Sequence, residues 1–120
     1  MSVDPGRLIL PALHWRRETG FGHEEPAIAS ALTLGVGGFV VFGGTSAELR
    51  ALTADLVKRA GRPLLIAADL ERGAGQQVQD LTEFPPPLAL ASLGDPDVIR
   101  WAAGVTAREA RSVGINWVLA

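Results

Sequence analysis

The middle of this 120-residue chain constrains its fold more than any other part. Two short runs of β-branched, aliphatic and aromatic residues, 36–42 and 64–68, have the length and composition of buried strands. Between them lies a segment with apolar residues at helical spacing, which opens with the capping-box pair Thr45 and Glu48 and ends before Gly61. A strand, a helix and a second strand predict a βαβ unit with parallel strands and a right-handed crossover.

The flanking sequence continues this alternation of helices and strands. Apolar residues at helical spacing predict a helix over 24–34, and no strand is expected before it. Asp95 and Pro96 have the types that favour an N-cap and a first helical turn, and this helix is expected to close at Gly114, before a strand over 115–119. The residues after Asp69, as far as about Gly94, show little periodicity and predict a long loop. The chain therefore predicts an α/β fold with about three parallel strands and intervening helices.

Composition excludes several classes of partner. The 11 basic and 13 acidic residues are spread along the chain, so neither a nucleic-acid-binding surface nor a polybasic membrane patch is expected. The chain has no cysteine, and His14 and His23 have no carboxylate at metal-ligand spacing around both, so we expect no metal site. The N-terminus lacks the pattern of a signal peptide, and no apolar run is long enough to span a membrane. These features predict a soluble, cytoplasmic protein with a neutral or small-molecule partner.

Asp69 is the residue with the strongest indication of a binding role. It follows the second strand of the βαβ unit, and ligands of parallel α/β folds bind at the carboxyl ends of strands. Glu71 lies two residues further on, so both carboxylates share one side if the strand geometry continues. Carboxylates at a pocket rim suit sugar recognition, because their oxygens accept charge-assisted hydrogen bonds from hydroxyl groups. Position alone leaves open a second interpretation, in which Asp69 is a solvated strand end that helps to cap a turn.

Five segments in order along nearly the whole chain resemble one known family. They are GRLILPAL, GVGGFVVFGG, LLIAADLERGAGQQV, TEFPPPLALASLGD and AREARSVGINWVLA. Together they resemble the N-terminal domain of glycoside hydrolase family 3. The most specific piece is the aspartate that closes the second strand, with the acidic residue and glycine-containing turn that follow it. The loop ERGAGQQ is longer than the EGGRVQR form of the N-acetylglucosaminidases, so their sugar-binding arginine is not assigned to any residue here.

The resemblance implies a fold and an activity. The fold is the N-terminal portion of a TIM-like (β/α)8 barrel, left incomplete because such a barrel takes about 250 residues. The activity is retaining hydrolysis of terminal β-linked sugars, β-glucosidase-like, without a cofactor. Asp69 matches the residue that binds hydroxyls of the non-reducing sugar, while Glu71 is a supporting position in the loop and Arg72 a salt-bridge partner without a firm role. Residues 1–120 are then part of one family 3 N-terminal domain.

The same resemblance places the catalytic residues outside this chain. The nucleophilic aspartate and the acid/base of the family would come from later strands, beyond Ala120. A sheet of three parallel strands also leaves an edge exposed. We therefore expect the isolated chain to be marginally stable and catalytically inactive, with a β-glycoside or oligosaccharide as the ligand. The sequence gives no indication of an oligomeric state.

Alternatives to the β-glucosidase interpretation remain. One is a β-N-acetylhexosaminidase of the same family, and another is a non-catalytic, truncated carbohydrate-binding fragment. A nucleotide-binding domain rests on glycine content alone, because the glycines do not form a dinucleotide fingerprint. The glycine-rich turn before Thr45 could bind an anion or could be a plain capped turn. Of the tryptophans, Trp101 and Trp117 are expected in the core, and Trp15 is left open as a sugar-stacking residue.

Overall fold

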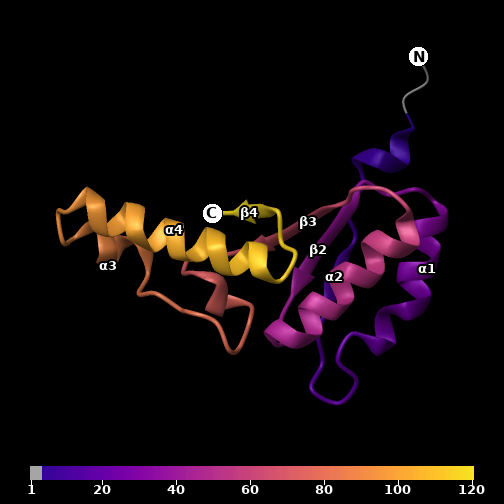
Figure 1. Cartoon of the computed structure of the whole chain (residues 1–120), viewed down its shortest axis with the longest axis horizontal. Helices are drawn as coiled ribbons and strands as arrows, with labels where there is room; N and C mark the ends of the chain where they lie inside the picture. The colour runs from indigo at the N-terminus through magenta and orange to yellow at the C-terminus, as the bar shows by residue number, and fades with distance from the viewer. Residues whose placement is uncertain (1–3) are drawn as a thin grey trace.

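A computed structural model describes residues 4–120 as an α/β fold built on one parallel sheet (Figure 1). The sheet has four strands in the order β1-β2-β3-β4, and each neighbouring pair is parallel. The strands are β1 (Ala12–His14), β2 (Gly38–Phe42), β3 (Leu65–Asp69) and β4 (Trp117–Leu119). The helices are α1 (Glu25–Thr33), α2 (Ser46–Ala60), α3 (Pro87–Ala91) and α4 (Pro96–Ser112), with 3-10 turns η1 (Pro5–Leu8), η2 (Gly22–Glu24) and η3 (Ala74–Gln76).

The number of strands corrects the sequence prediction. Three parallel strands were expected, and the described residues form a fourth, β1, ahead of the helix α1. This strand has only three residues, of which the central Leu13 is buried while Ala12 and His14 are exposed. A single buried side chain gives no periodic signal, and Pro11 directly before the strand cannot donate to a ladder. Its carbonyl nevertheless accepts a hydrogen bond from the amide of Val40, which joins the segment before β1 to β2.

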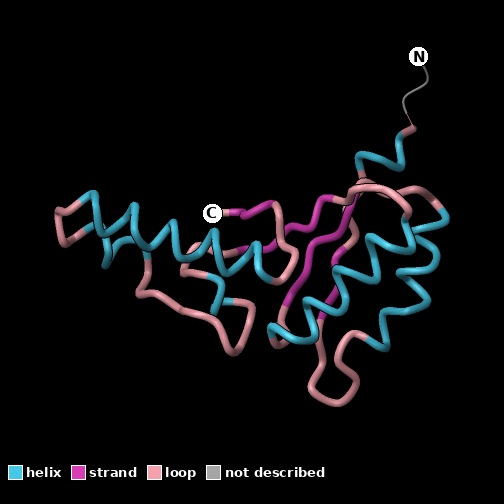
Figure 2. The backbone as a smooth tube through the Cα atoms, viewed as in Figure 1, coloured by secondary structure: helices cyan, strands magenta, loops and turns pink. Residues whose placement is uncertain are grey.

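The segment between β3 and α4 also differs from the expected featureless loop (Figure 2). Most of it is loop, but it contains the 3-10 turn η3 and the short helix α3. The helix α3 begins with Pro87 at its first position, where the missing N–H costs nothing. With five residues it is too short for its apolar spacing to stand out from the sequence around it.

The capping signals predicted for α2 are confirmed. The Thr45 hydroxyl accepts from the Glu48 amide at 3.3 Å, and the Glu48 carboxylate accepts from the Thr45 amide at 2.9 Å. At the other end Gly61 takes the left-handed conformation that closes the helix, with φ of 63°. Leu49 and Leu56 on the apolar stripe of the helix are fully buried. The helix therefore starts and ends as its sequence predicts, and of the predicted apolar stripe only Val57 is exposed.

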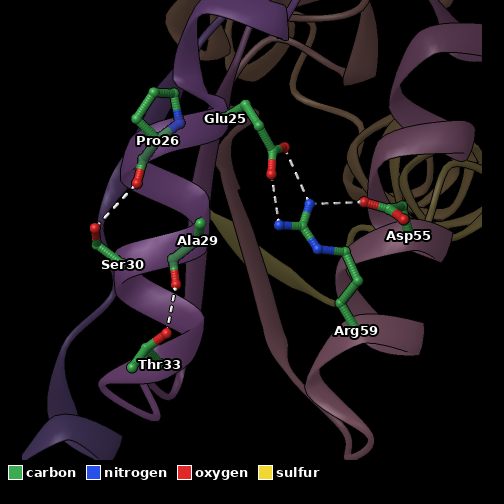
Figure 3. Close-up of polar contacts among 7 residues, drawn as sticks. All are labelled: Glu25, Pro26, Ala29, Ser30, Thr33, Asp55 and Arg59. Carbon is green, nitrogen blue, oxygen red and sulfur yellow. Dashed lines mark hydrogen bonds and ion pairs between the residues drawn. The ribbon is translucent and has the colours of Figure 1, made fainter.

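Helices α1 and α2 are linked by one cation on their outer surface (Figure 3). The Arg59 guanidinium donates to both carboxylate oxygens of Glu25, at 3.0 and 2.6 Å, and also to Asp55 one turn earlier in α2. Hydrogen bonding to these two carboxylates raises the pKa of Arg59. The bidentate geometry fixes the start of α1 against the last turn of α2.

The two faces of the sheet have different environments. Leu13, Val41 and Ala68 share one face, and all three are buried in the core beneath the helices. The alternate residues face the other way, where the described helices give little cover, and several of them are exposed or half-buried. Ala67 and Gly38 are the buried exceptions on that face.

Strand β4 is held to β3 by an asparagine side chain as well as by its backbone. The Asn116 side-chain oxygen accepts from the Ile66 amide at 2.8 Å, and its side-chain nitrogen donates to the Leu64 carbonyl at 2.9 Å. These bonds extend the ladder at the point where β4 begins. The strand predicted over 115–119 is thus confirmed, although it begins at Trp117 and the two residues before it lead into it.

The prediction that Trp101 and Trp117 lie in the core is wrong for the described chain. Trp101 on α4 is 60% exposed and contacts the Phe84 ring edge-to-face, while Trp117 on β4 is 44% exposed. No strand pairs with the outer edge of β4 within residues 4–120. An apolar cavity of about 540 Å³ lies between α3, α4 and the ends of β3 and β4, and Val118 and Ala120 line it. The apolar faces of α4 and β4 therefore lack a further layer.

None of the helices formed by residues 4–120 combines the length and the apolar character needed to span a bilayer. The described chain measures 48 × 42 × 19 Å, and α3 with the start of α4 projects away from the sheet at one end (Figure 1).

Replacing Thr45 by alanine removes the hydroxyl half of the capping box at the start of α2 and leaves the bond from the backbone amide to Glu48. We expect the free energy of unfolding to fall by about 1 kcal/mol, because a helix N-cap oxygen is lost from a partly buried position. Urea unfolding followed by circular dichroism measures this change. The matched variant Thr45→Ser keeps the hydroxyl and should stay within about 0.5 kcal/mol of the parent. Equal losses in both variants would contradict the capping role.

Candidate functional site

The carboxyl ends of the four strands form one row of side chains. His14 is the register partner of Phe42, and Asp69 is the register partner of Leu119. Extending the β2–β3 register by two residues from its last recorded pair, Val40 with Ala67, brings Phe42 opposite Asp69. Register partners in a sheet point to the same face. The four residues therefore stand side by side on the face opposite the buried core.

Asp69 occupies the position that the sequence predicts for it, at the end of β3. It is half-buried, and its carboxylate has no hydrogen-bond partner among residues 4–120. Its backbone carbonyl accepts from the Gln77 side-chain nitrogen at 3.4 Å, and the Gln77 side-chain oxygen accepts from the Gly43 amide at 3.2 Å. Gln77 thus bridges the segments that follow β2 and β3. The sequence gives no signal for this bridge, because it joins positions 34 residues apart.

The other two predicted site residues do not join Asp69. The ladder continues only as far as Leu70, whose amide donates to the Leu119 carbonyl and whose side chain is buried on the helix side. Glu71 then accepts a hydrogen bond from the Gln76 side chain at 2.7 Å, and this bond lowers the pKa of Glu71. Arg72 pairs with the Glu83 carboxylate. Glu71 and Arg72 therefore hold their own loop together.

The loop after β3 is tied to two helices by carboxylates. Asp80 accepts from the Ser46 amide at 2.7 Å and from its hydroxyl at 2.6 Å, and these bonds lower the pKa of Asp80. Glu109 on α4 accepts from the Thr82 amide at 2.9 Å and from its hydroxyl at 2.7 Å. The Asp80 carboxylate also occupies the N-terminus of α2. Of the two interpretations of the glycine-rich turn before Thr45, the structure favours the capped turn, because the chain supplies its own anion there.

The two histidines come together around Glu24, which their sequence spacing does not indicate. The Glu24 carboxylate oxygen accepts from the His14 amide at 2.9 Å, and it lies 3.9 Å from the His14 Nδ1 and 3.5 Å from the His23 Nε2. The His23 Nδ1 lies 2.9 Å from the Thr19 hydroxyl. Within residues 4–120 no three such side chains are arranged to hold a metal ion. This cluster closes the loop between β1 and α1.

Trp15, the candidate sugar-stacking residue, has an internal partner in the structure. Its indole N–H donates to the Glu48 carboxylate at 3.0 Å, and its ring packs against the core beside Gly43 and Gly44. The indole hydrogen bond, with those of the Thr45 amide and hydroxyl, holds the pKa of Glu48 below its ordinary value. Trp15 therefore fixes the segment after β1 to the N-terminus of α2.

This lowered pKa predicts an acid sensitivity that depends on Trp15. A carboxylate whose pKa is lower in the folded than in the unfolded chain stabilises the fold above the unfolded value, near 4.5, and loses that effect as the pH falls through the folded value. Trp15→Phe removes the hydrogen bond that lowers the pKa of Glu48 most. The loss of stability between neutral pH and about pH 3 should therefore become smaller. Urea unfolding at a series of pH values measures it.

The control for this measurement is Trp101→Phe, which changes an exposed tryptophan that makes no contact with Glu48. We expect it to leave the pH dependence of stability unchanged. The same pH dependence in the parent and in Trp15→Phe would contradict the coupling between Trp15 and Glu48.

The sheet, the covering helices and the row of strand ends define a parallel α/β protein of the class in which ligands bind at the carboxyl edge. Residues 23–120 match the family model described as the glycosyl hydrolase family 3 N-terminal domain. The chain therefore belongs to glycosyl hydrolase family 3.

Relatives and solved structures agree with this membership. A β-N-acetylglucosaminidase/β-glucosidase of Cellulomonas fimi is 44% identical over 95 residues, which cover 78% of this chain and 17% of that protein. A β-hexosaminidase of Photobacterium profundum is 46% identical over 55 residues, which cover 42% of this chain and 16% of the relative. The solved β-glucoside phosphorylase BglX bound to 2FGlc superposes over 98% of this chain and 20% of its own, with a TM-score of 0.82 and 24% identity. The chain thus spans about a sixth of the length of the curated relatives it matches and has the fold of the corresponding part of BglX.

Proposed function

We propose that this chain is the sugar-binding first part of a family 3 glycoside hydrolase that releases terminal β-linked sugars with retention of configuration. The observation that carries the proposal is the state of Asp69, a half-buried carboxylate at a strand end with no internal hydrogen-bond partner among residues 4–120. Leaving a partly desolvated carboxylate without a partner costs free energy. A ligand with paired hydroxyl groups removes that cost.

Asp69 serves in this proposal to bind and orient the sugar. Each carboxylate oxygen accepts a charge-assisted hydrogen bond from one of two vicinal hydroxyls, which fixes the sugar ring relative to the sheet. The bridge from Gln77 to the Asp69 carbonyl and to the Gly43 amide limits the movement of the backbone beneath it. Glu71 and Arg72 keep the following loop closed and leave the open face to the ligand.

The hydrolytic step requires residues from outside the described row. Retaining hydrolysis uses a nucleophilic carboxylate and an acid/base about 5 to 5.5 Å apart in the usual arrangement. His14, Phe42, Asp69 and Leu119 include one carboxylate, and the proposal gives that carboxylate to binding. We propose that residues 1–120 are part of an N-terminal family 3 domain and that later strands supply the catalytic pair.

The names of the relatives support two sugar classes. The Cellulomonas fimi protein carries both the β-glucosidase and the N-acetylglucosaminidase name, and the Photobacterium profundum protein is a β-hexosaminidase. We therefore keep β-glucosides and β-N-acetylhexosaminides as alternative substrates. Calorimetric titration of the complete protein with glucose and with N-acetylglucosamine separates the two alternatives. A β-glucosidase should bind glucose more tightly, and a β-N-acetylhexosaminidase should bind N-acetylglucosamine more tightly.

The catalytic part of the proposal predicts the DNA sequence beyond the codon for Ala120. We expect the reading frame to continue and to encode the nucleophilic aspartate and the acid/base that the family takes from later strands. The purified 120-residue chain should then hydrolyse p-nitrophenyl β-glycosides no faster than buffer. A stop codon after Ala120 would favour a non-catalytic carbohydrate-binding fragment. Enzyme-like hydrolysis by the isolated chain that disappears in Asp69→Ala would contradict the division of roles.

The binding role of Asp69 predicts the effect of Asp69→Asn in the protein encoded by the complete reading frame. Removing the charge weakens its hydrogen bonds to the sugar, so kcat/KM should fall about 10- to 100-fold, corresponding to the roughly 1.5–3 kcal/mol of a charged hydrogen bond. Hydrolysis of p-nitrophenyl β-glucoside and N-acetylglucosaminide measures it. The matched control is Asp97→Asn, an exposed carboxylate on α4 that pairs with Arg100. If Asp69→Asn were as active as Asp97→Asn, the proposed binding role of Asp69 would be wrong.

A further inference from the structure

The row at the carboxyl edge contains a second polar side chain, His14, two strands away from Asp69. Neighbouring strands are about 4.8 Å apart, so the two backbones are separated by about 10 Å across Phe42. Both side chains project from the open face with the Phe42 side chain between them, so a sugar that contacts both lies across the outer edge of Phe42. The His14 side chain is 61% exposed, so a ligand can reach it.

The imidazole of His14 has a neighbour on each of two sides. Its ring stacks on the Phe42 ring, with centroids 4.9 Å apart and planes within 7° of parallel. The Glu24 carboxylate oxygen lies 3.9 Å from the His14 Nδ1, and it also accepts a hydrogen bond from the His14 backbone amide. A side chain whose ring already stacks on a neighbour loses less conformational freedom when it binds a ligand than a free one does.

These contacts leave the second ring nitrogen available. The His14 Nε2 has no hydrogen-bond partner among residues 4–120, whereas Nδ1 faces a negative charge. The tautomer with its proton on Nδ1 directs that proton toward the Glu24 carboxylate. The Nε2 lone pair is then an acceptor for a hydroxyl group on the open face.

We infer that His14 is a second sugar-binding residue, which accepts a hydrogen bond from a hydroxyl of the sugar that Asp69 binds. This inference rests on the proposed function, because it needs a sugar at Asp69. Phe42 is a positioning residue in this arrangement, since it acts by fixing the His14 ring. His14 and Asp69 then contact opposite sides of one sugar, and the residue at position 14 contributes to sugar specificity.

The test compares sugar binding by the parent, His14→Phe and Asp69→Asn in the protein encoded by the complete reading frame. Calorimetry with methyl β-glucoside and with N-acetylglucosamine gives the dissociation constants. His14→Phe keeps a ring to stack on Phe42 and removes the acceptor, so we expect about three- to tenfold weaker binding, the loss of one neutral hydrogen bond. NMR of histidine labelled at Cε1 should show the His14 resonance move on addition of sugar, with His14→Phe identifying the signal.

The outcomes separate this inference from the proposed function. An unchanged dissociation constant in His14→Phe and an unmoved His14 resonance, together with weaker binding in Asp69→Asn, would overturn the role of His14 and leave that of Asp69. Binding that Asp69→Asn does not weaken would overturn both. Unfolding midpoints of the variants show whether each is folded, and His14 is exposed enough for the phenylalanine variant to retain the parent midpoint.

Discussion

The pairing of β2 with β3 is the constraint on which the rest of this structure depends. At its start the two backbones approach so closely that a Cβ atom on Gly38 would lie 1.8 Å from the Leu65 carbonyl oxygen. Only glycine permits this close approach. The approach in turn fixes which residues lie opposite one another along β2 and β3. The register then brings Phe42 beside Asp69, and the crossover helix α2 covers the other face. A shift of one residue would turn Asp69 toward the core.

The elements with strong local signals are predictable from sequence. The capping box of α2, the Asp95 cap of α4 and the glycine ends of both helices depend on residues a few positions apart, so their patterns are visible in one dimension. The strand β1 escapes prediction because a three-residue strand with one buried side chain has no period. The elements that carry Trp101 and Trp117 are predicted correctly. The burial of the two tryptophans is not, because a local pattern does not show which face of a helix or strand lacks a neighbour.

The candidate site is predictable in its position and not in its surroundings. Asp69 follows an apolar run, and that run marks the strand end. Its surroundings depend on hydrogen bonds between residues 27 or more positions apart, made by Gln77, Asp80 and Glu109. No spacing rule connects such partners. The same holds for His14, whose relation to Asp69 exists only through the register of three strands. Sequence identifies the residue at a strand end, and the fold determines its neighbours.

The alternation of side chains across the sheet also affects how this family member can diverge. Leu13, Val41 and Ala68 secure the core, while the residue that follows each of them belongs to the row on the open face. Substitutions in that row leave the packing beneath the helices intact, so they carry little penalty in folding. The chemistry that this row presents can therefore change through single replacements at strand ends without a matching loss of stability.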